Sequence, residues 1–392
     1  MMSRPAFWAH LFAALFLAPS HSSRAAVLPL VLNTWSGDFT GATHTAFDVL
    51  SQPGPAGDRL NALEKGLNYC ELHQCGGSVG FGGHPDASGE VTLDAMIMDA
   101  VTHDVGGVGG LRRVKRAISV ARGVLEHTNH SIVVGDAATR FAVEFLGMEE
   151  ETLSTPESEK AFEVWEEGGC QPNYYRGFVN CTTACPPYQL SDNDKEEKMK
   201  KPGTGISSSS SGRSSIKRQA RFSPHVHEGN HDTIGMVVID AQGDLACGVT
   251  TNGLGNKVPG RVGDSPLPGS GCYVENDVGG CACTGDGDVM LRFAPSAHAV
   301  MFMEGGASPT EAAERMIRKV AAFYPGYRGG MVCVNKRGEY GAAGYNFGLS
   351  FSVKGAGMQE VETFDVTPLG GVRKGGRKEK EEEKEESVAR ID

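Results

Sequence analysis

The stretch His231-Asp232-Thr233-Ile234-Gly235-Met236-Val237-Val238-Ile239-Asp240 decides how this chain is organised. Its run of Val, Ile and Met is typical of a buried strand, and a polar His-Asp-Thr triplet precedes that run. The residues upstream are rich in Ser, Lys and Arg and almost lack apolar side chains. Two interpretations are open. Thr233 simply begins a strand after a loop, or the chain is cut before Thr233, whose hydroxyl becomes a nucleophile with the new N-terminal amine as its base.

The N-terminus and the overall charge indicate the compartment and exclude some partners. Arg4 precedes an apolar run from Phe7 to Ala18, and mainly small residues follow, so we predict a signal peptide over residues 1–25. That run is too short to span a bilayer, and no later segment is long and apolar enough. The net charge of −11 argues against nucleic acid. We therefore expect a soluble protein of the secretory pathway, with no membrane or nucleic-acid partner.

The cysteines fit an oxidising compartment. The chain has 10 of them, too few for a disulfide scaffold at this length. Two groups are close enough in sequence for local disulfides: Cys70 with Cys75, and Cys170, Cys181 and Cys185.

No metal site is expected. Cys281-Ala282-Cys283 lacks a second pair of Cys or His ligands at zinc spacing. The glycine-rich turn that holds Asp286 and Asp288 lacks the bidentate Glu of a calcium loop. We therefore expect no metal ion and no cofactor.

Hydrophobic periodicity predicts the secondary structure. We predict helices over residues 58–71, 111–126, 137–145, 157–167 and 307–322, the last capped by Ser308. We predict strands over residues 27–35, 94–100, 131–134, 233–239, 245–250, 330–334, 340–344 and 349–353, and turns at the glycine-rich residues 105–110 and 284–288. Strands, helices and hairpins in this order indicate an α+β fold with antiparallel sheets covered by helices. Residues 190–230 predict a disordered linker, and the Lys/Glu-rich residues 371–392 predict a disordered tail.

Three polar loops flank Thr233 in sequence and are candidates to converge on it: residues 251–253, 260–266 and 284–288. Arg261 suits a carboxylate and Asp264 an ammonium. Thr284 and Gly285 offer a hydroxyl and a backbone N–H to an oxyanion. Together these groups match the backbone end of a free amino acid. The alternative is that Arg261 and Asp264 form a surface pair and the glycines only make turns.

Several of these segments resemble the glycosylasparaginase family of N-terminal-nucleophile hydrolases, over roughly residues 28–353 without the linker. The segments are Asn33-Thr34-Trp35, Gly77-Ser78-Val79-Gly80-Phe81-Gly82-Gly83, Thr92-Leu93-Asp94-Ala95-Met96-Ile97-Met98-Asp99, Cys170-Gln171-Pro172-Asn173-Tyr174, His231-Asp232-Thr233-Ile234-Gly235-Met236-Val237-Val238 and Gly260-Arg261-Val262-Gly263-Asp264-Ser265-Pro266. Their number and their order along the chain make the resemblance specific.

The resemblance implies a four-layer αββα sandwich and autoproteolysis between Asp232 and Thr233. The products are an α chain over residues 26–232 and a β chain over residues 233–392, which form one catalytic domain and pair as a homodimer of αβ units. The implied reaction is hydrolysis of the amide that joins N-acetylglucosamine to asparagine, the last step of glycoprotein breakdown. The implied location is a lysosome or vacuole, although secretion is also open.

The resemblance also implies roles for individual residues. Thr233 is the nucleophile, Thr251 supports it by a hydrogen bond, and Asp232 is the base of the autoproteolytic step. Thr284 and Gly285 form the oxyanion hole. The remaining implied roles are the α-carboxylate for Arg261, the α-amine for Asp264 with Gly285, the sugar side for Trp35, a bracing role for Ser78, and further substrate contacts for Val262, Gly263, Asp286 and Gly287.

The chain departs from the family pattern near the oxyanion threonine. Asp286 stands where the family usually carries Asn, and Cys281 and Cys283 replace alanines. Cys333 has no obvious disulfide partner. Two other functions stay open: a plant-type L-asparaginase/isoaspartyl peptidase of the same superfamily, and a secreted binding protein that keeps the fold without self-processing.

Overall fold

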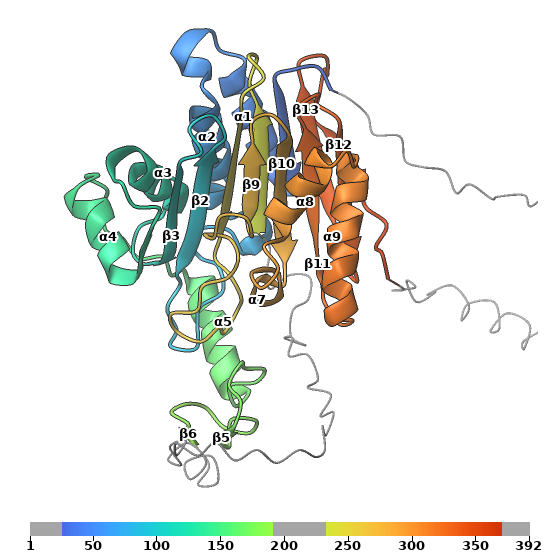
Figure 1. The fold of residues 1–392 in the computed structure, drawn as a ribbon. Helices are drawn as coiled ribbons and strands as arrows, with labels where there is room; N and C mark the ends of the chain where they lie inside the picture. Colours follow the sequence, from blue (N-terminus) through green and yellow to red (C-terminus); the bar gives the residue numbers. More distant parts are fainter. Residues whose placement is uncertain (1–25, 191–232, 371–392) are drawn as a thin grey trace, which may run out of the picture.

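The computed structural model describes residues 26–190 and 233–370. The predicted signal peptide, the linker from residue 191 onward, Asp232 and the charged tail lie outside the described residues. Two sheets stand at the centre of the described part, with helices on either side of the pair (Figure 1). No helix in this part is long and apolar enough to cross a membrane. The predicted α+β class is confirmed.

Within the described residues, the larger sheet has the strand order β14-β13-β1-β7-β8-β2-β3-β4. Neighbouring strands are antiparallel except β3 and β4, which are parallel. The strand bounds are β1 Leu30–Thr34, β2 Leu93–Asp99, β3 Val105–Leu111, β4 Ile132–Val134, β7 Thr233–Ile239, β8 Leu245–Thr251, β13 Ser350–Gly355 and β14 Glu362–Asp365. β7, the strand predicted from the opening stretch, therefore lies near the middle of this sheet.

The smaller sheet is antiparallel, with the order β12-β11-β10-β9. Its bounds are β9 Cys272–Glu275, β10 Gly279–Gly285, β11 Gly329–Asn335 and β12 Tyr340–Tyr345, and a separate short pair joins β5 Phe178–Val179 to β6 Gln189–Leu190. Leu190, where the predicted linker begins, is thus the last residue of β6.

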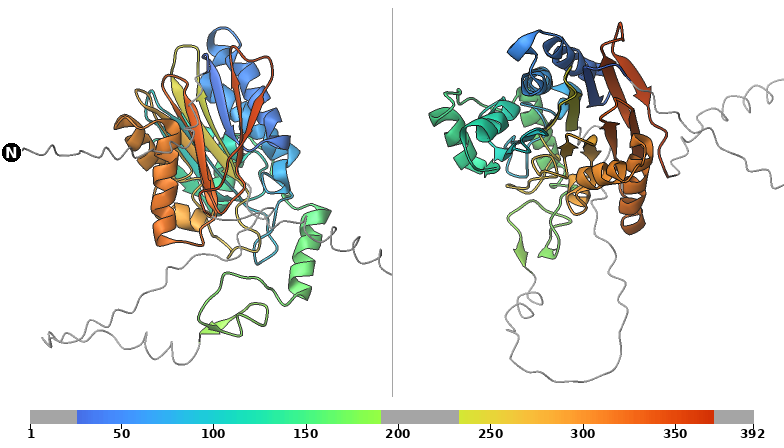
Figure 2. Two further views of the ribbon diagram at one scale, coloured as in Figure 1. Left: turned by 90° about the vertical axis from the view of Figure 1, so that its right-hand side faces the viewer. Right: turned by 45° about the horizontal axis from the view of Figure 1, so that its top comes forward.

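Helices cover the outer faces of both sheets (Figure 2). On the larger sheet these are α1 Thr40–Leu50, α2 Arg59–His73, α3 Ala117–His127 and α4 Gly135–Glu144, and on the smaller sheet α8 Pro295–Glu304 and α9 Pro309–Phe323. α5 Pro156–Glu167 leads to the β5–β6 pair at one end of the molecule (Figure 1). The short helices are η1 Gly37–Phe39, η2 Gly54–Gly57, η3 Cys75–Gly77 and α7 Gly287–Met290.

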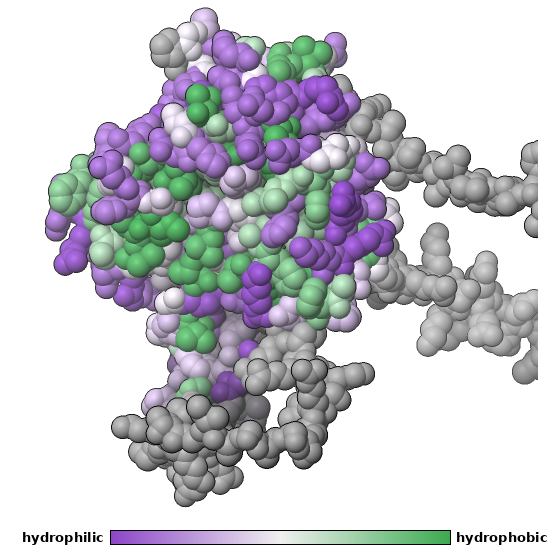
Figure 3. Space-filling view, viewed as in Figure 1, coloured by the Kyte–Doolittle hydropathy of each residue, from purple (hydrophilic) through white to green (hydrophobic). Residues whose placement is uncertain are grey.

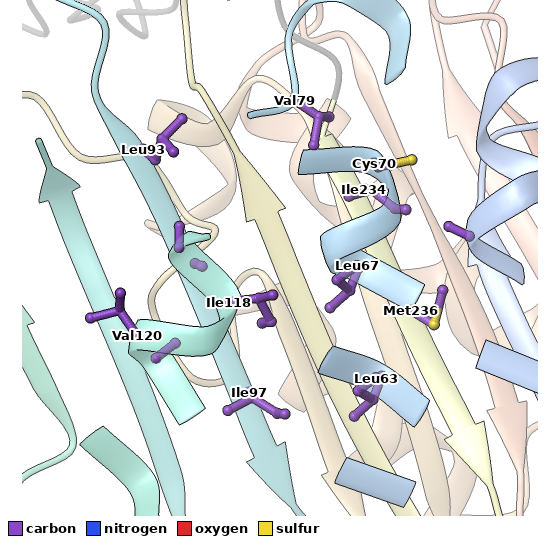
Figure 4. Close-up of a cluster of buried hydrophobic side chains, with 14 of the residues drawn as sticks. Leu63, Leu67, Cys70, Val79, Leu93, Ile97, Ile118, Val120, Ile234 and Met236 are labelled. Atoms are coloured by element: carbon purple, nitrogen blue, oxygen red, sulfur yellow. The ribbon is translucent and has the colours of Figure 1, made fainter. Parts of the chain in front are cut away.

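Three large apolar cores and a small cluster around Trp165 pack the described elements together, and β7 contributes to two of the large cores. Ile234 and Met236 point toward α2 and its neighbours (Figure 4), and Val238 belongs to the same core. Val237 and Ile239 point the other way, into the core between the sheets. A third core packs the smaller sheet against α8 and α9. Because successive side chains of a strand alternate in direction, burial on both faces explains why β7 is apolar throughout.

The same alternation aims Thr233 at the smaller sheet. Thr233 and Gly235 lie on the face of β7 that carries Val237. Close to Thr233 the two sheets approach closely, because a Cβ on Gly235 would stand 2.8 Å from the Cβ of Ala282 in β10. Small residues on both strands therefore bring the end of β10 near the start of β7.

Two sequence predictions are wrong around β3. Residues 105–110 form a strand and not a turn, and α3 begins at Ala117, so residues 111–116 are not helical. The glycines of β3 serve close packing: a Cβ on Gly106 would stand 2.0 Å from the carbonyl oxygen of Ala121 in α3. Glycine here lets a helix lie directly on the strand, which sequence reasoning interpreted as a turn.

The predicted turn at residues 284–288 is also partly wrong, because Thr284 and Gly285 end strand β10. Glycines and small residues in β10 obscured its strand pattern. The remaining predicted helices and strands are present with shifted ends, and Ser308 does cap α9, with Glu311 completing a capping box. α1, α8, β9 and β14 were not predicted.

All ten cysteines lie in the described residues, and eight of them form disulfides. Cys70–Cys75 was predicted, and Cys170 pairs with Cys185 and not with Cys181. Cys333 does have a partner, in contrast to the expectation: it faces Cys281 on the adjacent strand and bonds to it. The fourth disulfide, Cys247–Cys272, was not predicted, and Cys181 and Cys283 are free and buried.

Glu71 of α2 is fully buried beneath the larger sheet. One carboxylate oxygen accepts hydrogen bonds from the Ile118 N–H at 2.9 Å and the Thr250 hydroxyl at 2.5 Å. Burial raises the pKa of Glu71 to about 8. Between its ordinary pKa and about 8, the folded protein keeps a proton that the unfolded chain releases. The stabilisation that comes from this proton is therefore complete below the pKa that Glu71 has in the unfolded chain. It is lost as the pH rises to about 8, by up to about 1.4 kcal/mol per pH unit.

We therefore expect the wild-type protein to unfold at a lower temperature at pH 8 than at pH 5. Glu71→Gln, which has no proton to lose, should narrow this difference. Differential scanning calorimetry at the two pH values is the measurement, with the exposed Glu159→Gln of α5 as the control. An unchanged difference in Glu71→Gln would show that Glu71 does not cause the pH dependence.

Candidate active site

A small pocket lies where β7 begins and where β8 and β10 end. Thr233, the first residue of β7, pairs in register with Thr251, the last residue of β8. The residues that line the pocket are Thr233, Thr251, Gly253, Leu254, Arg261, Gly263, Asp264, Ser265, Gly285 and Gly287. The structure thus brings together at Thr233 the three loops that are separate in sequence.

The hydroxyls of Thr233 and Thr251 are in contact. Thr233 Oγ1 donates to Thr251 Oγ1 at 3.1 Å, and both residues are buried. Thr251 Oγ1 also accepts a hydrogen bond from the Gly253 N–H at 2.9 Å. The second threonine is therefore itself held in place, and it fixes the direction of the Thr233 hydroxyl.

The backbone of Thr233 is held by the end of β1. Its carbonyl oxygen accepts hydrogen bonds from Thr34 Oγ1 at 3.2 Å and from the indole N–H of Trp35 at 3.1 Å. Trp35 has a left-handed backbone with φ +75°, and its ring packs edge-on against Phe347 at 5.3 Å. Trp35, predicted to lie on the sugar side, therefore contacts the candidate nucleophile directly.

Arg261 is largely buried, with 13% of its side chain exposed. It pairs with Asp288 of α7, at 3.1 Å from Nη2 to Oδ2. Burial lowers the pKa of Arg261, but Asp288, Asp94 and Asp264 outweigh it and raise that pKa above its usual value. The alternative of a surface ion pair between Arg261 and Asp264 is therefore wrong, because Arg261 is largely buried and pairs with Asp288. Sequence reasoning missed the role of Asp288, which it considered only as a calcium ligand.

Asp264 and Asp286 add negative charge beside Arg261. Both are buried, and each has one oxygen, Oδ2, without a hydrogen-bond partner among the described residues. Burial raises the pKa of each to about 6; Asp288 raises both further, while Arg261 opposes the rise. The other oxygen of Asp286 caps α7 by accepting from the Val289 N–H. An unpaired carboxylate oxygen that is buried beside a guanidinium fits a ligand that carries both an ammonium and a carboxylate.

Thr284 and Gly285 stand opposite, at the end of β10. The Thr284 hydroxyl is buried and has no partner within the described residues. Gly285 has φ +125°, and a Cβ there would stand 2.4 Å from the Cα of Gly329 in β11. Only glycine fits this position. The unpaired Thr284 hydroxyl and the Gly285 backbone N–H therefore belong to consecutive residues at the end of β10.

The other predicted residues surround this centre. A Cβ on Gly263 would stand 3.1 Å from the Arg261 guanidinium, and one on Gly287 would stand 2.5 Å from Asp264 Oδ1. The Ser78 carbonyl accepts from the Asn252 N–H at 3.0 Å, next to Thr251. The Val262 side chain packs over Gly109 of β3.

Lys257, which the sequence reasoning did not select, is buried in the same region. Its ammonium donates to the carbonyl of Asn252 at 2.5 Å. Nothing in the sequence pattern around Lys257 indicates that this lysine lies near the pocket. In the described part of the chain, no cluster of His, Cys, Asp and Glu side chains is arranged to hold a metal ion.

Comparison with known proteins covers both sides of Thr233. Residues 22–361 match the asparaginase family. The chain is 47% identical over 317 residues to the N(4)-(β-N-acetylglucosaminyl)-L-asparaginase of Rattus norvegicus, across 81% of this chain and 84% of the rat protein. The protein of the same name from Mus musculus is 46% identical, with the same coverage. A Drosophila melanogaster protein named as a putative enzyme of this kind is 42% identical over 88% of this chain and 84% of its own length.

We expect Gly285→Ala to destabilise the protein by about 1–3 kcal/mol, because the new methyl group meets the backbone of β11 and φ stays positive. Gly305→Ala is the matched control, since its Cβ would meet only ordinary contacts of 3.5 Å or more. Chemical denaturation measures both variants. Equal stability of the two would contradict the packing described at the end of β10.

Proposed function

The chain belongs to the asparaginase family, and we propose that it is an N(4)-(β-N-acetylglucosaminyl)-L-asparaginase: it hydrolyses the amide bond between N-acetylglucosamine and asparagine in glycoprotein degradation. One observation carries the proposal. The hydroxyl of Thr233 lies 3.1 Å from that of Thr251, in a pocket that Arg261 and Asp264 also line. A nucleophile beside an amino-acid subsite fits a substrate whose reacting amide belongs to a free asparagine.

We infer the four-layer αββα sandwich of N-terminal-nucleophile hydrolases as the fold. Three separate cores, one between the sheets and one under each helical layer, support this assignment. We also infer that residues 26–232 and 233–392 become an α chain and a β chain that share one catalytic domain. Both parts supply residues to the site: Trp35 and Ser78 come from the first, and Thr233 comes from the second.

We propose that the chain matures by cutting itself between Asp232 and Thr233. Asp232 lies outside the described residues, and its carboxylate is the proposed base. The Thr233 hydroxyl attacks the preceding carbonyl carbon, and an N-to-O acyl shift gives an ester that water hydrolyses. The hydrogen bonds of Thr34 and Trp35 to the Thr233 carbonyl support this step, because they fix the residue next to the bond that breaks.

Once freed, the Thr233 amine serves as the base. An α-amine has a pKa of about 7.7–8.0 in model peptides, so part of it is neutral near pH 7. The amine takes the Thr233 hydroxyl proton while Oγ1 attacks the amide carbon of the substrate. The C–N bond then breaks, the proton passes to the leaving glycosylamine, and a β-aspartyl ester remains on Thr233. Water, deprotonated by the same amine, cleaves that ester and releases aspartate.

The remaining residues bind and stabilise. We propose that Arg261 holds the substrate α-carboxylate and that Asp264 holds the α-ammonium, with Val262, Gly263, Asp286 and Gly287 completing this end. Thr284 Oγ1 and the Gly285 N–H are the proposed oxyanion hole. The unpaired, buried Thr284 hydroxyl supports this role, because such a donor needs no rearrangement when negative charge develops.

Both alternative functions are less well supported than the first proposal. A plant-type L-asparaginase/isoaspartyl peptidase would share the nucleophile and the amino-acid subsite. The relatives at 47% and 46% identity are named for the glycosylated substrate, which favours the first proposal. A non-processing binding protein is disfavoured by the Thr233–Thr251 contact, which binding alone does not require.

We further propose that αβ units pair as a homodimer within the secretory pathway, in a lysosome or vacuole or after secretion. Figure 3 shows apolar surface at the end of the molecule where β3 and α4 lie. Val134 and Phe145, in β4 and at the end of α4, are 57% and 75% exposed. Exposed apolar patches of this kind commonly mark association surfaces. The disulfides support an oxidising compartment.

Self-processing predicts two bands for the purified wild-type protein on a denaturing, reducing gel, and Thr at the N-terminus of the smaller chain. Thr233→Ala removes the attacking hydroxyl and should remain a single chain. Edman sequencing of the smaller band identifies the cut. A wild-type protein that stays full-length, or a Thr233→Ala variant that is still cut, would refute the proposed maturation.

Arg261→Ala should mature normally but bind substrate weakly, with KM raised by about 100-fold for the loss of a charge-assisted bidentate contact. Steady-state kinetics with N-acetylglucosaminyl-asparagine measures the change. Arg318→Ala, an exposed arginine of α9, is the control. A wild-type KM in Arg261→Ala would remove its assigned role.

The same assay with β-aspartyl dipeptides decides between the related activities. We expect kcat/KM to favour the glycosylated asparagine. Clear preference for the dipeptides would replace the proposed function by the isoaspartyl peptidase.

A further inference from the structure

We propose that Lys257 is a positioning residue for hydrolysis: its ammonium anchors the peptide unit between Asn252 and Gly253, and this peptide fixes the Thr251 hydroxyl against Thr233. The proposal rests on the function proposed above. It assigns to the reaction a side chain that does not line the pocket but acts through the backbone behind it.

Lys257 is one of the largest fully buried side chains in the described residues, with 1% exposure. Its Nζ donates to the Asn252 carbonyl at 2.5 Å and to the Thr92 carbonyl at 3.4 Å. Burying an ammonium costs several kcal/mol, which favourable contacts must offset. Burial lowers its pKa to about 8, opposed by Asp94 and Asp86. An apolar side chain would fill this space without the cost of burying a charge, so a cation held by two carbonyls points to a specific role.

The first of these carbonyls belongs to the peptide unit whose N–H reaches the active site. That peptide joins the Asn252 carbonyl, which accepts from Lys257, to the Gly253 N–H, which donates to Thr251 Oγ1 at 2.9 Å. Because a peptide unit is planar, holding its carbonyl also aims its N–H. The positive charge of Lys257 beside this carbonyl oxygen polarises the peptide unit and strengthens its N–H as a donor.

This peptide needs an anchor because one side of it is conformationally free. Gly253 has φ +87°, a region in which glycine moves easily. Asn252 is held on its other side, by its N–H to Ser78 and by its side-chain amide to Thr92. Neither bond fixes the peptide that follows Asn252. In the described residues, Lys257 is the side chain that holds the carbonyl of that peptide.

Lys257 also stands directly behind Arg261. A Cβ on Gly253 would be 3.1 Å from both Lys257 Nζ and Arg261 Nη1, so this glycine separates the two cations. Arg261 has its own ion pair with Asp288, in which Lys257 takes no part, so we expect this pair to persist when Lys257 is replaced. The loss should therefore affect the nucleophile, and hence kcat, more than the hold on the substrate carboxylate.

Lys257→Met tests this with the mature enzyme and N-acetylglucosaminyl-asparagine. We expect kcat per cleaved β chain to fall by about 10- to 100-fold, as for other small misplacements of a reacting group, and KM to change by less than about threefold. Lys354→Met is the matched control: Lys354 is also buried and donates to a carbonyl, that of Gln359, but it lies on β13. Its kcat should match that of the wild type. A wild-type kcat in Lys257→Met, or an equal loss in Lys354→Met, would overturn the proposal.

A double-mutant cycle separates positioning from a general structural effect. On a Thr251→Ala background the peptide has no hydroxyl to hold, so adding Lys257→Met should change kcat by less than about twofold. Independent, multiplying losses would show that Lys257 does not act through Thr251.

Lys257→Arg keeps the buried charge and serves if the methionine variant does not mature. Its planar guanidinium is larger than the ammonium and places its N–H donors differently from Nζ, so we expect kcat to fall at least about fivefold, again only when Thr251 is present. A wild-type kcat in Lys257→Arg would overturn the proposal. If the wild type itself does not cleave the substrate, the proposed function fails. If the wild type is active and the lysine variants match it, this inference alone fails.

Discussion

The hydrogen bond between the hydroxyls of Thr233 and Thr251 is the interaction on which the rest of the site depends. It exists because β7 and β8 form a hairpin whose register pairs the first residue of one strand with the last residue of the other. A slip of one residue would turn Thr233 to the opposite face of the sheet. The close approach at Gly235 disfavours such a slip, because it would place Ile234 or Met236 where even a Cβ would stand 2.8 Å from the Cβ of Ala282.

The charges around this pair are costly to bury, and their arrangement supports the proposed amino-acid subsite. Arg261, Asp264, Asp286 and Asp288 form one unbalanced group, and unpaired oxygens remain on two of the carboxylates. A structural ion-pair network would satisfy its members. Here the shortage of partners matches the two charged ends of an amino acid. Glycines at positions 263 and 287 let the backbone approach Arg261 and Asp264, where a side chain would displace these groups.

Sequence reasoning identified the parts of the fold and site that are local. β7 was found because its apolar run is continuous, and α9 because a helical pattern follows the candidate cap Ser308. β3 and β10 were mistaken because their glycines, which permit close packing in three dimensions, look like turn residues in one. Asp288 and Lys257 were missed for a related reason: Asp288 pairs with an arginine 27 residues away, and the sequence pattern does not show that Lys257 is buried. Cys281 and Cys333 likewise meet only because β10 and β11 are neighbours.

The proposed mechanism requires the Thr233 hydroxyl to attack the substrate amide. Its most direct test is to mix the mature enzyme with N-acetylglucosaminyl-asparagine, quench with acid during turnover, and determine by mass spectrometry which residue carries an aspartyl group. We expect an aspartyl ester on the peptide that begins with Thr233. An enzyme that turns over this substrate while the ester forms on another residue would contradict it.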